Sequence, residues 1–176
     1  LYAAAADTAK ARFSWLLVNL VTAVVASAII GLFEGSLEQM VALAVLMPIV
    51  ASMGGNAGTQ TLTVAVRALA MKDLTATNAT RVIGKELIVG GLNGIIFAVI
   101  TGGVAWVWFG NLALGAVIAA AMVINMVVAG FAGTTIPLML ERAGIDPAIA
   151  SSVFLTTVTD VVGFAVFLGL AAAFLL

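Results

Sequence analysis

Residues 48–63 read PIVASMGGNAGTQTLT and lie within one of the long apolar runs of the chain. Between Gly54 and Gln60 this stretch carries three glycines, an asparagine and a glutamine. Hydrocarbon offers no hydrogen-bond partner to an amide, so these groups must be satisfied inside the fold or by water. The stretch therefore predicts a membrane-spanning segment with one face that avoids lipid.

The composition supports a membrane protein. The chain has 176 residues, of which 64% are hydrophobic and 9% charged, and a soluble core of this size could not cover so much apolar surface. We therefore expect a multi-pass protein of the cell membrane, with the lipid bilayer as its solvent. The absence of cysteine and histidine excludes disulfides, thiolate chemistry, haem and the usual zinc sites. A net charge of −1 predicts no nucleic-acid partner.

Five apolar runs are long enough to cross a bilayer as helices, which takes about 20 residues. They predict an all-α membrane protein in which residues 1–176 form a single transmembrane domain. The predicted spans are approximately residues 13–33, 40–66, 87–109, 112–140 and 148–174. The first residue is Leu1 and no secretory signal precedes the first span, so we expect the sequence to be part of a longer chain.

The basic residues predict the orientation of these spans. All of them fall before the first span, between the second and third, or between the fourth and fifth: Lys10, Arg12, Arg67, Lys72, Arg81, Lys85 and Arg142. The other side has Glu34, Glu38 and the uncharged turn Gly110-Asn111. Because loops rich in Lys and Arg stay in the cytoplasm, we expect a cytoplasmic N-terminus and an external C-terminus.

Three local patterns have structural interpretations. Asp146-Pro147 predicts an N-cap and first helical turn for the fifth span. The stretch MKDLTATNATR, residues 71–81, predicts a polar cytoplasmic connection. Gly90 and Gly94 predict a close contact between two helices.

One acidic residue, Asp160, lies deep within a predicted span. Counted from Ala148, it is about 18 Å into the membrane, near the midplane. An ionisable group there costs on the order of 3 kcal/mol and usually faces a wet cavity or a partner. No Lys or Arg lies inside a span to pair with it. We expect a functional carboxylate; the alternative is a protonated Asp160 hydrogen-bonded to a neighbouring helix.

Polar residues accompany Asp160 on one face of its helix. Ser152, Thr156, Asp160 and Gly163 follow one another at spacings of four, four and three. A similar row on the second span contains Ser52, Asn56, Thr59, Gln60 and Thr63. Measured from Arg67, Asn56 is about 17 Å deep and thus level with Asp160. Two polar rows that meet at one depth predict the lining of a narrow aqueous path.

The glycines of residues 48–63 allow two interpretations. Gly54, Gly55 and Gly58 could permit a bend or an unwound turn, whose free carbonyls would line the path. Carbonyl, amide and carboxylate oxygens suit a hard cation. Alternatively, Gly54 and Gly58 simply allow tight helix packing, which leaves Asn56 and Gln60 unexplained. We favour the first interpretation.

The charge of Asp160 bears on which ion would pass. One carboxylate could serve sodium or a proton equally well. In a C2 homodimer with the fifth span near the axis, two Asp160 side chains would converge, and a divalent cation would relieve their repulsion. Mg²⁺ commonly keeps several waters and binds through one or two carboxylates, although Ca²⁺ and Mn²⁺ are not excluded by this argument.

Two stretches resemble a known family. The sequence PIVASMGGNAGTQTLTVAVRALA, residues 48–70, followed by a basic loop, resembles the second transmembrane helix of the MgtE magnesium channels and transporters. The sequence ERAGIDPAIASSVFLTTVTDVVGFAVFLGLA, residues 141–171, resembles the family's connection between the fourth and fifth helices together with its fifth helix. The resemblance covers essentially the whole chain as the membrane domain of that family.

The resemblance implies a homodimer with five helices per subunit and a pore lined by helices 2 and 5 of both copies. It implies a channel for partly or fully hydrated Mg²⁺, the transported ion, with Asp160 as the ion-selective carboxylate. The implied metal-site residues are Asp160, Thr156, Asn56, Gly55 and Gly58, and the implied gate residues are Ser152 and Thr59. Some relatives have asparagine at both gate positions. Better-known relatives also carry a cytoplasmic regulatory domain that senses magnesium, so we expect this chain by itself to show weaker or no closure by internal magnesium.

Other functions predict different behaviour. A secondary transporter of divalent ions, coupled to a cation or proton, would also suit a broken helix beside a midplane carboxylate. An intramembrane protease would need an aspartyl dyad across a dimer, since Asp160 is the only midplane acid, and we expect no enzyme. A structural subunit predicts that Asp160→Ala leaves every flux unchanged.

Overall fold

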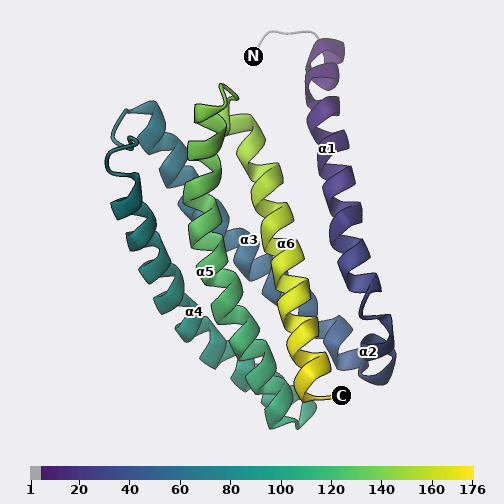
Figure 1. The fold of residues 1–176 in the computed structure, drawn as a ribbon. Coiled ribbons are helices and arrows are strands. Elements are labelled where there is room, and N and C mark those ends of the chain that lie inside the picture. Colours follow the sequence, from purple (N-terminus) through teal and green to yellow (C-terminus); the bar gives the residue numbers. More distant parts are fainter. Residues whose placement is uncertain (1–4) are drawn as a thin grey trace.

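The computed structural model describes residues 5–176, which form a bundle of α-helices joined by short turns (Figure 1). The helices are α1 (Ala5–Gly31), α2 (Glu34–Gln39), α3 (Val41–Ala70), α4 (Ala79–Phe109), α5 (Leu112–Arg142) and α6 (Pro147–Phe174). Within residues 5–176 there is no strand. Five of these helices, all but α2, are long and apolar enough to cross a membrane. The predictions of an all-α protein and of five membrane helices are confirmed.

The helices extend beyond the predicted spans mainly at one end of the bundle. α3 continues to Ala70, and α4 begins at Ala79, so that Arg81 and Lys85 lie in its first turns. Of the predicted polar connection, only residues 71–78 lie outside helices. Hydropathy marks the part of a helix that can lie in lipid, whereas helix hydrogen bonds form equally well in the flanking water. The short α2 occupies part of the connection between the first two spans.

The long helices pack around α5. α5 contacts α3, α4 and α6, and it contributes Ile118, Met122 and Asn125 to the fully buried core. α3 crosses behind α5 and α6, and α1 packs against α6 at one edge (Figure 1). Thr61 of α3 donates a hydrogen bond to Glu86 Oε2 of α4 at 3.0 Å. The bundle therefore has an edge helix, α1, whose span is largely uncovered in a single chain.

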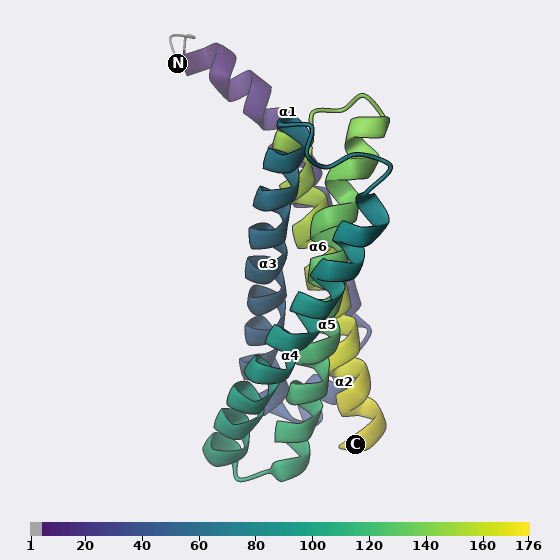
Figure 2. The same ribbon diagram turned by 90° about the vertical axis from the view of Figure 1, so that its left-hand side faces the viewer.

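The chain reversals separate the two ends of the bundle. The start of α1 and the α3–α4 and α5–α6 connections lie at one end, whereas the α4–α5 turn and the C-terminus lie at the other (Figures 1 and 2). The first turns of α1 project from the bundle (Figure 2). All seven Lys and Arg residues belong to the first of these ends. This asymmetry is the one from which the cytoplasmic N-terminus is predicted.

Glycines bring α4 and α5 into backbone contact. A Cβ at Gly90 would lie 2.7 Å from the Met126 carbonyl oxygen, and one at Gly94 would lie 3.1 Å from the Cα of Val123. Closer to the other end of the bundle, a Cβ at Gly102 would lie 2.8 Å from the carbonyl oxygen of Gly115. Small residues that allow such close approach are a standard device of membrane helix packing. The prediction of a helix contact at Gly90 and Gly94 is confirmed.

The start of α6 follows its predicted capping pattern. The Asp146 side chain accepts a hydrogen bond from the Ala148 backbone N–H at 2.9 Å, and Pro147 is the first residue of the helix. Gly144, with φ of 72°, provides the left-handed residue just after α5. These local signals fix where α6 begins and therefore the depth of every side chain along it.

We predict that Gly102→Ala destabilises the bundle by about 1–3 kcal/mol, because the added methyl group would collide with backbone of α5. Its neighbour is a matched control, since a Cβ at Gly103 meets nothing within 4 Å. Gly103→Ala should leave the stability unchanged or raise it by up to about 1 kcal/mol through helix propensity. Thermal unfolding of both purified variants in detergent checks this, and equal melting temperatures would contradict the packing described.

Candidate functional site

α3 runs as one uninterrupted helix from Val41 to Ala70 and includes residues 48–63. The expectation of an unwound turn at the glycines is wrong. Gly54 faces the Asn125 side chain of α5, and a Cβ at Gly58 would lie 2.8 Å from Leu155 Cδ1 of α6. These glycines are explained by the packing alternative, because neighbouring side chains fill the space beside them. An unwound turn there would leave backbone carbonyls unpaired in a dry interior.

The polar residues of α3 lie on a different face from the buried glycines. Gly54 faces α5, and Gly55 faces α6, where its Cβ would lie 3.7 Å from Thr159 Oγ1. Each residue turns the helix by about 100°, so Asn56 turns further away from α5. The whole polar row is exposed in the single chain: Ser52, Asn56, Thr59, Gln60 and Thr63. Glycines and polar side chains therefore serve separate faces of one helix.

The contacts between α3 and α6 fix the relative depth of the two polar rows. The helices run antiparallel, with Ala51 beside Gly163, Gly55 beside Thr159 and Gly58 beside Leu155. In this register residue 56 lies opposite residues 157–158. Asn56 is therefore within about 5 Å of the level of Asp160 along the helix axes. This geometry agrees with the equal depth expected from the sequence.

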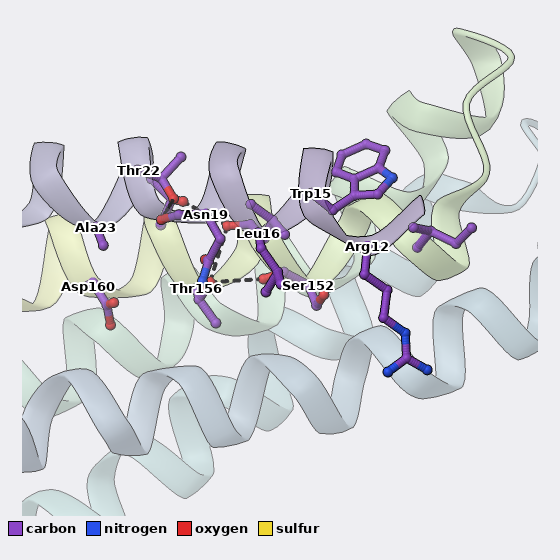
Figure 3. Close-up of a pocket in the computed structure, with 12 residues that line it drawn as sticks. Arg12, Trp15, Leu16, Asn19, Thr22, Ala23, Ser152, Thr156 and Asp160 are labelled. Atoms are coloured by element: carbon purple, nitrogen blue, oxygen red, sulfur yellow. Dashed lines mark hydrogen bonds between the residues drawn. The ribbon is translucent and has the colours of Figure 1, made fainter. Parts of the chain in front are cut away.

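Ser152, Thr156 and Asp160 line an open cavity of about 1000 Å³ between α1 and α6. The three side chains follow one another along α6 (Figure 3). The twelve lining residues come from α1 and α6 alone, so the predicted α3 residues Asn56 and Thr59 are not among them. Gly163, which the sequence placed in the same row as Asp160, faces Asn125 and Ala51 instead. Within one chain, the structure thus brings together only the α6 half of the predicted site.

α1 contributes residues that the sequence analysis did not assign to the site. Asn19 and Thr22 line the cavity, and the Asn19 side chain extends towards Thr156 (Figure 3). Asn19 is the only amide side chain among residues 13–31. An amide within an apolar span could have indicated a polar neighbour for α1. Arg12 also lines the cavity, at the end far from Asp160 (Figure 3). The polar neighbours of the carboxylate in this cavity are therefore mainly hydroxyl and amide groups, beside apolar side chains of both helices.

The hydroxyl groups of both rows are oriented by the helices that carry them. Thr156 Oγ1 donates to the Ser152 carbonyl at 3.0 Å, and Thr59 Oγ1 donates to the Gly55 carbonyl at 2.7 Å. Thr63 Oγ1 donates to the Thr59 carbonyl at 2.8 Å. A hydroxyl whose proton is used in this way presents its oxygen lone pairs outward. Both rows therefore offer acceptors, which suits a cation or the hydrogen atoms of its bound water.

The donor set available from one chain is small. Within residues 5–176, no three Asp, Glu, His or Cys side chains lie close enough together to hold a metal ion. Asp160 is partly exposed and is the one carboxylate in its cavity. A single carboxylate with hydroxyl and amide neighbours is too small a donor set for a tight metal-binding cage, but it could contact a cation that keeps most of its waters.

Comparison with known proteins identifies related sequences. A family model, MgtE, described as a divalent cation transporter, matches residues 47–170. The magnesium transporter MgtE of Bacillus subtilis is 35% identical over 93% of this chain. The proteins of that name from Enterococcus faecalis and Thermus thermophilus are each 36% identical, over 95% and 92% of the chain. The chain spans 36–37% of the length of these relatives.

We predict that the cavity between α1 and α6 contains water, and the absence of cysteine from the sequence allows a direct test. Asn19→Cys and Thr156→Cys should react with a small charged thiol reagent, because a thiol ionises and reacts in water. Val21→Cys is the control, since Val21 is exposed on the side of α1 opposite to Asn19 and meets lipid. It should react at least about tenfold more slowly. Equal rates at the three positions would contradict a wet cavity.

Proposed function

Because this chain belongs to the MgtE family, we propose that it forms the ion-conducting part of a magnesium channel in the cell membrane. The observation that carries the proposal is the position of Asp160. Its carboxylate lies deep in a helix long and apolar enough to cross a membrane, and it lines a cavity together with Ser152 and Thr156. An ionisable group at that depth is costly unless it meets water, a partner or an ion. Mg²⁺ is the proposed ion because the three relatives are magnesium transporters.

The chemistry of the rows fits a hydrated divalent cation. Mg²⁺ gives up its waters reluctantly, so it would pass with most of its inner shell intact. Those waters would donate hydrogen bonds to the outward-facing Thr156 oxygen and to the Ser152 hydroxyl on α6, while the Asp160 carboxylate neutralises part of the charge. Ser152 lies two helical turns, about 12 Å, towards the basic end from Asp160. Ser152 and Thr59 together form the proposed gate at the cytoplasmic end of the path.

A second copy of the chain would complete this path. The polar row of α3 is exposed in one chain, and lipid cannot satisfy Asn56 or Gln60. A C2 homodimer that places α3 and α6 of both copies around the axis would cover this row and bring two Asp160 side chains together. In that arrangement Asn56 would join Asp160 and Thr156 as an ion-contacting residue. Gly55 and Gly58, the other predicted metal-site residues, would contribute by letting α6 lie close to α3.

The continuous α3 does not separate a channel from a coupled carrier. Both interpretations could use a broken helix beside the carboxylate, and α3 is unbroken from Val41 to Ala70, so transport measurements distinguish the two. Single-channel currents through the reconstituted protein would support a channel. Flux that strictly requires a proton or sodium gradient would support a carrier.

We predict that Asp160→Asn lowers magnesium uptake by about tenfold or more, equivalent to ~1.4 kcal/mol of ion stabilisation, because the amide keeps the shape and removes the charge. The full-length protein is expressed in cells that lack their own magnesium uptake, and growth on low magnesium and ion uptake are measured. Asp73→Asn, an identical change in an exposed loop, is the control and should rescue growth fully. Full rescue by Asp160→Asn would count against the ion site.

We also predict that Asn56→Leu impairs uptake while the protein still assembles, because leucine removes an amide from the proposed lining and suits an apolar environment. Val64→Leu, at an exposed apolar position on the same helix, serves as the matched control. Uptake and the elution volume of each purified variant are compared. Normal uptake by Asn56→Leu would leave the polar row of α3 without a role in conduction.

A further inference from the structure

Asn125, in the middle of α5, is a fully buried amide in the core of the bundle, with 0% of its surface exposed. Its Nδ2 donates a hydrogen bond to the Val50 carbonyl oxygen of α3 at 2.9 Å. Its Oδ1 is buried and has no hydrogen-bond partner among residues 5–176. It is the only amide of α5 and had no place in the site expected from the sequence.

The Asn125 side chain fills a gap between three helices. Gly54 of α3 leaves the space on one side, since a Cβ there would collide with the amide. Gly163 of α6 leaves it on the other, where a Cβ would lie 2.9 Å from Nδ2 and 3.3 Å from the Cα of Ala51. One side chain of α5 therefore lies beside both α3 and α6 where these two helices pack together. In the sequence, Gly54 is two residues before Asn56 and Gly163 is three residues after Asp160, so both glycines are close in depth to the proposed ion path.

Stability alone does not account for an amide at this position. A buried polar atom without a partner destabilises a fold relative to an apolar group of the same shape. Leucine would fill a similar volume with no unpaired oxygen. What the amide adds is direction, because a hydrogen bond prefers a narrow range of lengths and angles, whereas apolar contacts permit sliding. The bond to Val50 therefore fixes the position of α3 along α5, the helix on which α6 also packs.

We propose that Asn125 is a positioning residue for the ion path. Its amide holds α3 on α5 beside Gly163 of α6, close to the level of Asp160. Because α6 packs on the same helix, this bond fixes the distance between Asn56 and Asp160 and thereby the discrimination of the path between Mg²⁺ and the larger Ca²⁺. Selectivity between these ions depends on the size and rigidity of the oxygen-lined space. The inference rests on the proposed function for its effect on ions, whereas the fixed placement of α3 can be tested without transport.

The first test measures the placement of α3. A Cβ at Gly55 would lie 3.7 Å from Thr159 Oγ1, so Gly55→Cys together with Thr159→Cys forms a pair that mild oxidation can cross-link. Asn125→Leu introduced into this pair should slow cross-linking by about fivefold, because α3 is no longer held in one register. Met126→Leu is the matched control, a volume-conserving change of the next buried residue, and should leave the rate unchanged. An unchanged rate in Asn125→Leu would overturn the positioning role.

The second test measures ion discrimination in the full-length protein without the cysteines. Asn125→Leu should fold to at least the normal amount, and the ratio of Mg²⁺ to Ca²⁺ uptake should fall by about fivefold. A normal ratio in correctly folded Asn125→Leu overturns the proposal. Loss of uptake in Asp160→Asn is the separate criterion for the proposed function, so failure of that function and failure of this inference give different results.

If Asn125→Leu does not fold, two alanine substitutions test whether the hydrogen bond of Asn125 or packing alone sets the discrimination between ions. Gly54→Ala alone should abolish uptake, because its methyl group collides with the Asn125 amide. Gly54→Ala combined with Asn125→Ala removes that collision and should restore folding and uptake, but not the Mg²⁺ to Ca²⁺ ratio, since the hydrogen bond to Val50 is absent. Recovery of the normal ratio in the double variant would mean that packing alone sets the path, which overturns the proposal.

Discussion

Lipid cannot form hydrogen bonds, and this constraint orders the whole molecule. It requires each long helix to pair its own backbone and each polar side chain to find protein or water. α3 meets the requirement with two faces. Gly54 and Gly58 lie against α5 and α6, whereas Asn56 and its row turn away from the buried glycines. The same helix can therefore pack tightly in the core and present acceptors to a path.

Close packing between small residues provides the framework for the polar groups. α4 and α5 approach through glycines, and α3 and α6 approach through Gly55, Gly58 and their partners. Because the interior is close-packed, a displacement of one helix moves the side chains on its neighbours. The amide of Asn125 lies where α3, α5 and α6 meet. It is beside Gly163, three residues along α6 from Asp160. Asn125 therefore links the close-packed helices to the level of the proposed ion path.

The sequence predicted those features whose causes are local. The length of the apolar runs predicted the membrane spans, and the Asp146-Pro147 pair predicted the start of α6. The spacing of Gly90 and Gly94 predicted a contact between two helices. For the glycines of residues 48–63 the sequence favoured an unwound turn, which the continuous α3 contradicts. Glycine lowers the cost of both unwinding and close packing, so its presence does not distinguish them. The neighbours Asn125 and Leu155, distant in sequence, decide in favour of packing.

By itself, the sequence determined that the chain is a bundle of five membrane helices, that its basic residues gather at one end, and that Asp160 lies deep within a span. These properties follow from composition, helical rise and charge, which need no knowledge of neighbours. Only the tertiary structure decided that Asn19 of α1 shares the cavity of Asp160, and that Asn125 enters the core to bind α3. The direction in which a side chain points out of its helix is local, but the group that it meets depends on which helix packs there.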